Sequence, residues 1–214
     1  MFETRKSTLY VILAGIFITN AVVAELIGGK LIEVFGVPMS VGILPWPVVF
    51  ITTDLINEYF GQKGVRRLSV ITAGLIAYCF VLLYLALSIP AIGGMGVQDS
   101  AFSAVFGQSM WIIVGSITAF LVSQVIDVTL FHFVKNRTGN KMIWLRSTGS
   151  TVISQFFDTF IVLGIAFYLT GQMDTETYLK SGLTGYAVKL GIAILLTPVI
   201  YLAHWAIEKY IHNK

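Results

Sequence analysis

Long apolar runs recur along the whole chain and constrain its fold more than any other feature. Each run extends for about 20 residues, the length that an α-helix needs to cross the hydrocarbon core of a bilayer. Hydrophobic residues make up 56% of the 214 residues and charged residues only 12%, with a mean hydropathy of +0.83. Soluble domains carry about 25% charged residues. The sequence therefore predicts an integral membrane protein and excludes a soluble globular fold.

The apolar runs predict a compact, all-α bundle of six transmembrane helices that forms one domain over residues 1–214. Pro90 is expected to end the third helix, whereas Pro198 lies inside the sixth helix and is expected to kink it. The connections are short, which leaves no room for a separate domain. The predicted helices are Thr8–Gly28, Leu44–Phe60, Leu68–Ile89, Gln108–Val134, Ser147–Thr170 and Leu183–Ile207.

Basic residues are distributed unevenly among the predicted connections. Eleven of the 14 Lys and Arg residues fall in the two terminal tails and in the second and fourth loops, whereas Lys30 and Lys180 fall in the other loops and Lys189 inside a helix. Cytoplasmic loops are enriched in Lys and Arg. Both termini are therefore expected in the cytoplasm, and the net charge of +3 reflects membrane orientation rather than nucleic-acid binding. The eleven residues are Arg5, Lys6, Lys63, Arg66, Arg67, Lys135, Arg137, Lys141, Arg146, Lys209 and Lys214.

A short polar block, Ser-Gln-x-x-Asp, occurs twice within the apolar sequence. The copies span Ser123–Asp127 and Ser154–Asp158, 31 positions apart, on helices that are expected to run antiparallel as neighbours. A rise of 1.5 Å per residue puts the two aspartates about 10 Å and about 16 Å from the inner helix ends. Such a pair is typical of inverted repeats around a transporter binding site. The residues expected to meet in one layer near the middle of the membrane are Gln124, Asp127, Gln155 and Asp158.

Further ionisable groups are candidates for the same layer. In "TTDLINEYFG", Asp54, Asn57 and Glu58 have the spacing of one helix face. Lys189 lies inside the sixth helix, and its charge is expected to be balanced by Asp127, Asp158 or Glu58. Intramembrane charges are costly and mark functional pathways. A buried structural ion pair is the alternative for these residues.

Two glutamates have a simpler interpretation. Glu58 lies near the cytoplasmic end of its helix, where it could reach water or pair with Arg66 or Arg67. Glu25 lies close to the outer membrane interface, and we expect it to be solvated there.

The chemistry of this layer predicts a small, polar, planar solute. A carboxylate accepts two hydrogen bonds side by side, which suits the N1–H and 2-amino edge of a guanine-like ring, and the amides can donate and accept. Phe131, Phe156 and Tyr186 offer flat surfaces for stacking. We expect no metal and no cofactor, because the single cysteine cannot form a thiol pair and the histidines lack metal-ligand spacing. His132, His204 and His212 are expected at the membrane interface.

The segments "TDLINEYFG", "SQVIDVTLF", "WLRSTGSTVISQFFDT" and "GYAVKLGIAILLTPVIY" occur in this order on six short helices. In this respect the chain resembles the queuosine precursor transporter family, formerly described as vitamin uptake transporters. The resemblance covers nearly the whole chain. It implies a multi-pass protein of the bacterial inner membrane that takes up 7-deazaguanine bases, 7-cyano-7-deazaguanine or 7-aminomethyl-7-deazaguanine, and is not an enzyme.

Two alternatives to such a transporter differ in their sequence requirements. An intramembrane aspartyl enzyme could use two aspartates on adjacent helices, but the chain lacks a Gly-x-Gly-Asp block. A substrate-binding subunit of an ATP-driven uptake system would need a separate ATPase, because the chain lacks a P-loop. Ala73 and Ala77 have the Ala-x-x-x-Ala spacing of a docking patch for such a partner. A homodimer is a further alternative, and the expected partners are otherwise the deazapurine and the lipid bilayer.

Overall fold

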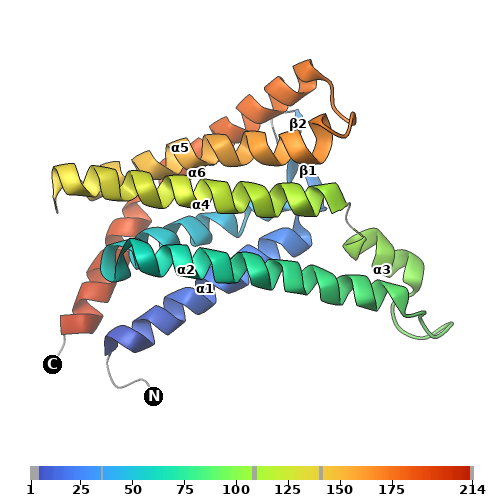
Figure 1. Cartoon of the computed structure of the whole chain (residues 1–214), viewed down its shortest axis with the longest axis horizontal. Coiled ribbons are helices and arrows are strands. Elements are labelled where there is room, and N and C mark those ends of the chain that lie inside the picture. Colours follow the sequence, from blue (N-terminus) through green and yellow to red (C-terminus); the bar gives the residue numbers. More distant parts are fainter. Residues whose placement is uncertain (1–4, 35, 108–109, 140–141, 213–214) are drawn as a thin grey trace.

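The computed structural model describes residues 5–34, 36–107, 110–139 and 142–212, and helices dominate it (Figure 1). The long helices are α1 (Arg5–Ile27), α2 (Trp46–Ser88), α4 (Met110–Thr138), α5 (Ile143–Leu163) and α6 (Thr175–His212). A π-helical turn, η2 (Gly164–Tyr168), extends α5. Over the part of the chain that the structure describes, these five helices are long and apolar enough to cross a membrane. This agrees with the predicted all-α membrane protein, and the number of membrane crossings stays a prediction.

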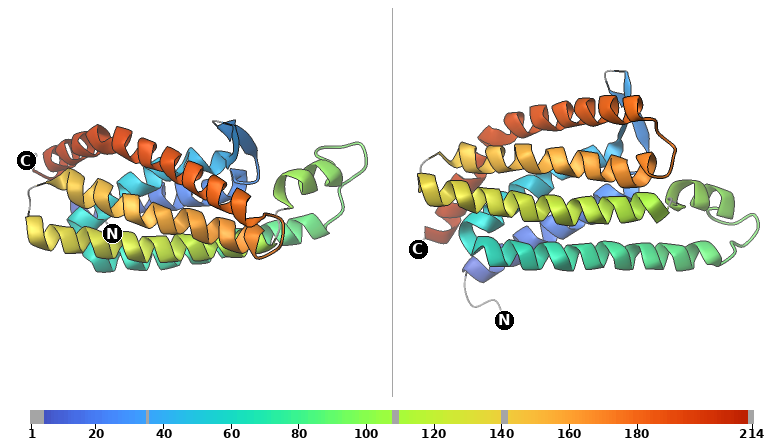
Figure 2. Two further views of the ribbon diagram at one scale, coloured as in Figure 1. Left: turned by 90° about the horizontal axis from the view of Figure 1, so that it is seen from above. Right: turned by 45° about the horizontal axis from the view of Figure 1, so that its top comes forward.

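Helix α2 consists of two arms that meet at Gly61. The backbone of Gly61 is non-helical, with φ 77° and ψ 172°, a conformation that is essentially restricted to glycine. The chain reverses direction there, so the two arms extend from one shared turn and diverge from it in the views of Figures 1 and 2. The arms correspond to the second and third predicted helices. The basic loop predicted between them is absent, since Lys63, Arg66 and Arg67 belong to α2 itself.

The bundle has two distinct ends, which Figure 2 shows well. The terminal end holds the start of α1, the turn at Gly61, the connection between α4 and α5, and the end of α6. The opposite end, called the hairpin end, holds the strands, the short helix α3 (Asp99–Phe106) and the connection between η2 and α6. The predicted topology groups the same connections, because it places the basic loops and both termini together. Which end faces the cytoplasm stays a prediction.

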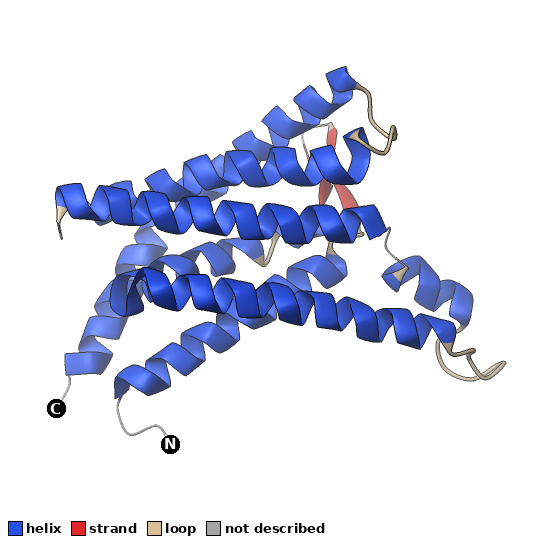
Figure 3. Ribbon diagram, in the orientation of Figure 1, coloured by secondary structure: helices blue, strands red, loops and turns tan. Residues whose placement is uncertain are grey.

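Four short elements at the hairpin end were not predicted. Strands β1 (Leu31–Val34) and β2 (Val37–Ser40) form an antiparallel hairpin, followed by the 3-10 turn η1 (Val41–Ile43). Among the described residues these are the only strands (Figure 3). Helix α3 occupies the loop between α2 and α4.

Helix boundaries around the fourth connection also differ from the prediction. Helix α4 continues to Thr138 and α5 already begins at Ile143, so Arg146 lies inside a helix rather than in a loop. The predicted helix start Gln108 and the basic residues Lys141 and Lys214 lie outside the described residues.

The interior is divided between an apolar and a polar half. A cluster of buried apolar side chains joins α1, α2 and α4, with Phe17, Val49 and Phe120 at its centre. The interface of α5 with α2, α4 and α6 is instead lined by buried hydroxyl, amide and charged side chains. Because polar groups are expensive in a bilayer, the polar half is where a functional site is expected.

Candidate functional site

Helix α5 carries a polar side chain on every turn of its buried face. A helix repeats every 3.6 residues, so positions three and four residues apart point to the same side of α5. Several hydroxyls bond to carbonyls of their own helix, for example Thr159 to Gln155 at 2.8 Å and Ser150 to Ser147 at 3.1 Å, which satisfies them away from water. Besides Arg146, the buried polar residues of α5 are Ser147, Ser150, Thr151, Ser154, Gln155, Asp158 and Thr159.

The two copies of the Ser-Gln-x-x-Asp block face each other across the interface of α4 and α5. Ser123 Oγ lies 3.4 Å from Asp158 Oδ1, and Ser154 Oγ donates to Asp127 Oδ1 at 3.2 Å. The serine of each copy thus contacts the aspartate of the other copy. Gln124 is the middle residue of α4, and Gln155 lies at the middle of the combined α5–η2 helix. The blocks therefore meet halfway along their helices, with all four Gln and Asp side chains buried.

Lys189 on α6 pairs with Asp158. Its Nζ lies 2.7 Å from Asp158 Oδ2, and both side chains are largely buried. Of the three carboxylates considered from sequence, Asp158 is therefore the partner. The pair ties α6 to α5 at the level of the repeated block.

Asp127 is held in a different way. Its Oδ1 accepts hydrogen bonds from Ser154 and, at 3.4 Å, from Thr151. Among the ion pairs of the described residues, none involves Asp127 or Asp54. The layer therefore contains one aspartate that is neutralised by a lysine and one that is held by hydroxyls alone.

The two glutamines also differ in whether their side chains have hydrogen-bond partners in the protein. The Gln124 amide reaches α2, where it contacts Thr53 and Ser69, each at 3.4 Å. The Gln155 side chain is buried, and its Oε1 accepts no hydrogen bond in the described structure. A buried polar atom without a partner requires an explanation such as an absent ligand or water.

A charged cluster lies between this layer and the terminal end. Glu58 Oε2 lies 3.0 Å from Lys135 Nζ and 2.9 Å from Arg146 Nη2, which joins α2, α4 and α5. Arg146 is only 1% exposed and also donates to the Gly139 carbonyl at 2.8 Å. The alternative in which Glu58 pairs with Arg66 or Arg67 is wrong, because its ion pairs are with Lys135 and Arg146. The exposed Arg66 side chain instead donates to Thr129.

Asn57 and the three aromatic rings predicted to stack on the substrate lie in different surroundings. Asn57 is fully buried and bonds to His132 at 2.7 Å. Phe131 is buried beneath the Arg146 guanidinium, 5.7 Å from its ring centre. Phe156 is 40% exposed and packs edge-on against Tyr186 at 5.5 Å. A role for these three rings in stacking stays a prediction.

Two residues expected at the membrane interface are buried. Glu25 is 8% exposed and accepts a hydrogen bond from Ser116 on α4. His204 is also 8% exposed and bonds to the Tyr59 hydroxyl at 2.9 Å. The expected solvation of Glu25 was therefore wrong, whereas the depth of His204 in the membrane stays a prediction. The His132 ring is partly buried, and the His212 side chain lies outside the described part.

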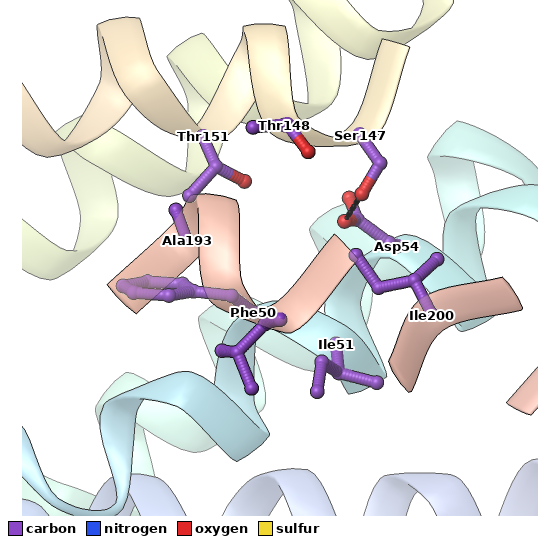
Figure 4. Close-up of a pocket in the computed structure, with 9 residues that line it drawn as sticks. Phe50, Ile51, Asp54, Ser147, Thr148, Thr151, Ala193 and Ile200 are labelled. Carbon is purple, nitrogen blue, oxygen red and sulfur yellow. Dashed lines mark hydrogen bonds between the residues drawn. The ribbon is translucent and has the colours of Figure 1, made fainter. Parts of the chain in front are cut away.

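A small cavity adjoins the layer between α2, α5 and α6 (Figure 4). Asp54 projects into it from α2 and accepts a hydrogen bond from Ser147 on α5. Thr148 and Thr151 lie along the same wall. The cavity measures about 10 Å³, which corresponds to one water molecule. Sequence analysis missed Ser147, Thr148 and Thr151, because Ser and Thr are common in membrane helices and have no distinctive spacing here.

The chain was compared with known proteins. The model of a family described as "Putative vitamin uptake transporter" matches residues 40–203. The chain belongs to this family. It is 29% identical over 176 residues to a "Probable queuosine precursor transporter" of Bacillus subtilis, covering 81% of this chain and 75% of the relative. A protein of the same name from Haemophilus influenzae is 26% identical over 167 residues, covering 75% of this chain and 66% of the relative. No solved structure matches the chain significantly.

Membership in this family makes the chain a multi-pass membrane transporter and agrees with the resemblance to queuosine precursor transporters noted from the sequence. The matched region contains the α2 acidic face, both Ser-Gln-x-x-Asp blocks and Lys189. The Ala73–Ala77 spacing does not form an open docking patch, because Ala73 is packed in the apolar core.

Proposed function

We propose that this protein takes up 7-deazaguanine precursors of queuosine, 7-cyano-7-deazaguanine or 7-aminomethyl-7-deazaguanine, across the bacterial inner membrane. Two relatives that align with most of the chain bear the name of queuosine precursor transporters, and this observation carries the proposal. The polar layer supplies a site with matching chemistry. The protein acts by binding and release, without a chemical step.

Asp127 is the residue that we assign to the donor edge of the base. A guanine-like ring presents N1–H and a 2-amino group side by side, and an ionised carboxylate accepts two such bonds. Asp158 is already engaged by Lys189, whereas Asp127 has only hydroxyl partners at Oδ1. The hydroxyls fix the orientation of the Asp127 carboxylate without neutralising it. Asp127 is therefore better prepared than Asp158 to accept bonds from a neutral donor.

Gln155 is a second acceptor for the base. Its Oε1 is buried without a partner, and it follows Ser154, which contacts Asp127. A substrate that donates several hydrogen bonds would satisfy this atom and the carboxylate together. Because leaving such an acceptor unpaired costs about 1–3 kcal/mol, the site favours solutes with more than one donor.

Substrate entry requires the helices to separate. The cavity beside the layer has room for about one water molecule, which is too little for a bicyclic base. The Lys189–Asp158 pair and the Glu58–Arg146 pair link the helices around the layer. We infer that these contacts close the pathway and that binding at the layer is coupled to their rearrangement.

Substitution of Asp127 by Asn tests the proposal. A neutral amide cannot accept both bonds, and loss of a charged hydrogen-bond partner costs roughly 1.5–3 kcal/mol, about a 10- to 100-fold loss of affinity. The measurement is queuosine in tRNA of cells that cannot synthesise the precursors, fed with each labelled base. Asp174→Asn is the matched control, because Asp174 is exposed and bonds only near its own helix start. Wild-type uptake by Asp127→Asn at equal protein levels would contradict the assignment.

A further inference from the structure

The cavity beside α5 has the features of an ion site that is separate from the Asp127 and Gln155 acceptors. Its polar wall consists of a carboxylate, Asp54, and the hydroxyls of Ser147, Thr148 and Thr151 (Figure 4). Phe50, Ala193 and Ile200 close the remaining sides with apolar groups. Oxygen atoms from α2 and α5 thus face one small space whose other sides are apolar.

Asp54 is an incompletely satisfied acceptor in this cavity. Its side chain is 2% exposed, and its Oδ2 is bonded by Ser147 while its Oδ1 is buried without a partner. A buried carboxylate oxygen without a donor is costly. The carboxylate points into the space ringed by the cavity residues, so a ligand there would meet the free oxygen directly.

The nearby charges leave Asp54 uncompensated. Arg146, the adjacent residue to Ser147, is paired with Glu58, and Lys189 is paired with Asp158. Asp127 on α4 is a second carboxylate close by, bonded through Thr151. Within the described structure, no cation forms an ion pair with Asp54. The local excess of negative charge favours a positively charged ligand.

We propose that a sodium ion binds in this cavity, coordinated by Asp54 and by the hydroxyls of Ser147, Thr148 and Thr151. Each hydroxyl can donate its single proton elsewhere and still offer lone pairs to a cation. Ser147 donates to Asp54, Thr148 shares a proton with Thr197 at 3.0 Å, and Thr151 donates to Asp127. The ligands are all oxygens, which suits a hard cation, and the space of about one water molecule accommodates a desolvated sodium ion.

Thr151 connects this cavity to the Asp127 carboxylate. Its side chain lines the cavity and its Oγ1 lies 3.4 Å from Asp127 Oδ1. An ion that orients Thr151 also orients Asp127, and it offsets the repulsion between the Asp54 and Asp127 carboxylates. Sodium binding would thereby prepare Asp127 for the base. This coupling rests on the proposed function, whereas the ion site does not.

Thermal unfolding of the purified protein, without any deazaguanine, tests the ion site. We expect NaCl to raise the unfolding midpoint relative to equal concentrations of KCl and choline chloride, because a ligand that binds only the folded state stabilises it. The half-saturating sodium concentration should increase at least about tenfold in Asp54→Asn and several-fold in Thr148→Val. Thr72→Val is the matched control, because Thr72 is buried and bonds only within its own helix.

Two results would overturn the ion site. One is an unfolding midpoint of the wild type that is identical in the three salts. The other is a sodium-dependent rise that is unchanged in Asp54→Asn and Thr148→Val. Where Asp54→Asn does not yield folded protein, Thr148→Val decides, because it keeps the carboxylate and removes one ligand.

Uptake into proteoliposomes at constant pH tests the coupling. An inward sodium gradient should accelerate uptake of the labelled base, and Thr151→Val should lose most of this acceleration while Thr72→Val retains it. Uptake that follows a pH gradient and ignores sodium would overturn the coupling and assign a proton instead. Failure of the proposed substrate gives a different result, since sodium would still stabilise the protein while no deazaguanine is transported.

Discussion

The Lys189–Asp158 pair carries the clearest prediction at the scale of single residues. Its atoms are 2.7 Å apart, and both side chains are largely buried. Removing one member leaves the other as a buried, uncompensated charge, which costs about 3–5 kcal/mol. Lys189→Met should therefore lower stability and impair uptake at neutral pH. Lys189→Met combined with Asp158→Asn should recover folded protein, measured by thermal unfolding, and part of the uptake.

Double substitutions with other carboxylates serve as controls for this pair. Lys189→Met with Asp127→Asn or with Glu58→Gln should not recover stability, because neither carboxylate contacts Lys189 in an ion pair. Normal uptake by Lys189→Met alone, on both sides of neutral pH, would show that the lysine neither holds Asp158 nor takes part in transport.

Periodicity and charge were sufficient to predict part of the candidate site. Asp127 and Asp158 stand out because a carboxylate in an apolar run is rare, and two copies at similar depth indicate facing helices. The hydroxyls of Ser147 and Thr151 give no such signal, since Ser and Thr satisfy themselves within membrane helices. Arg146 was assigned to a loop because Lys and Arg near helix ends usually belong to cytoplasmic loops. Its ion pair with Glu58 depends on the packing of α5 against α2, which the sequence pattern does not reveal.

At the scale of elements, the reversal of α2 depends on Gly61. Its φ of 77° and ψ of 172° cost a residue with a side chain about 1–3 kcal/mol. Gly61→Ala should lower the unfolding midpoint and the yield of folded protein. Gly74→Ala on the same helix is the matched control: a Cβ there meets open space, and alanine is the better helix former.

A contrary result for Gly61→Ala would assign the reversal of α2 to a different cause. Equal midpoints for Gly61→Ala and Gly74→Ala would show that the turn tolerates a side chain and that packing of the two arms, rather than the glycine, sets the reversal.

Long helices were predicted well and short elements were not. Apolar length identifies α1, α4 and the combined α5–η2 helix within about four residues at each end, because the bilayer imposes a minimum length. Helix α6 begins eight residues before the predicted start, so Lys180 is helical rather than in a loop. The strands "LIEV" and "VPMS" are four residues each, too short for a period-two pattern to emerge. The prediction of a loop after Phe60 was wrong for another reason. The chain reverses direction at a single glycine, Gly61, so the basic residues that follow it are helical.

At the scale of the whole molecule, charge separates the two ends of the bundle. The terminal end holds the helix ends and turns that carry Arg5, Lys63, Lys135 and Lys209, whereas Lys30 and Lys180 belong to the hairpin end. Since cytoplasmic segments are enriched in Lys and Arg, the terminal end should face the cytoplasm. If each arm of α2 crosses the membrane once, the chain crosses six times, which places both termini on that side.

Single-cysteine labelling tests this orientation. In a Cys79→Ser background, Met95→Cys and Gln172→Cys place exposed thiols at the hairpin end, and Asn136→Cys places one near the terminal end. A membrane-impermeant maleimide added to intact spheroplasts should label the first two and not the third. Permeabilising the membrane should expose Asn136→Cys, which controls for its reactivity. Labelling of Asn136→Cys alone in intact cells would invert the topology, and it would then place the Glu58–Arg146 cluster on the outer side of the polar layer.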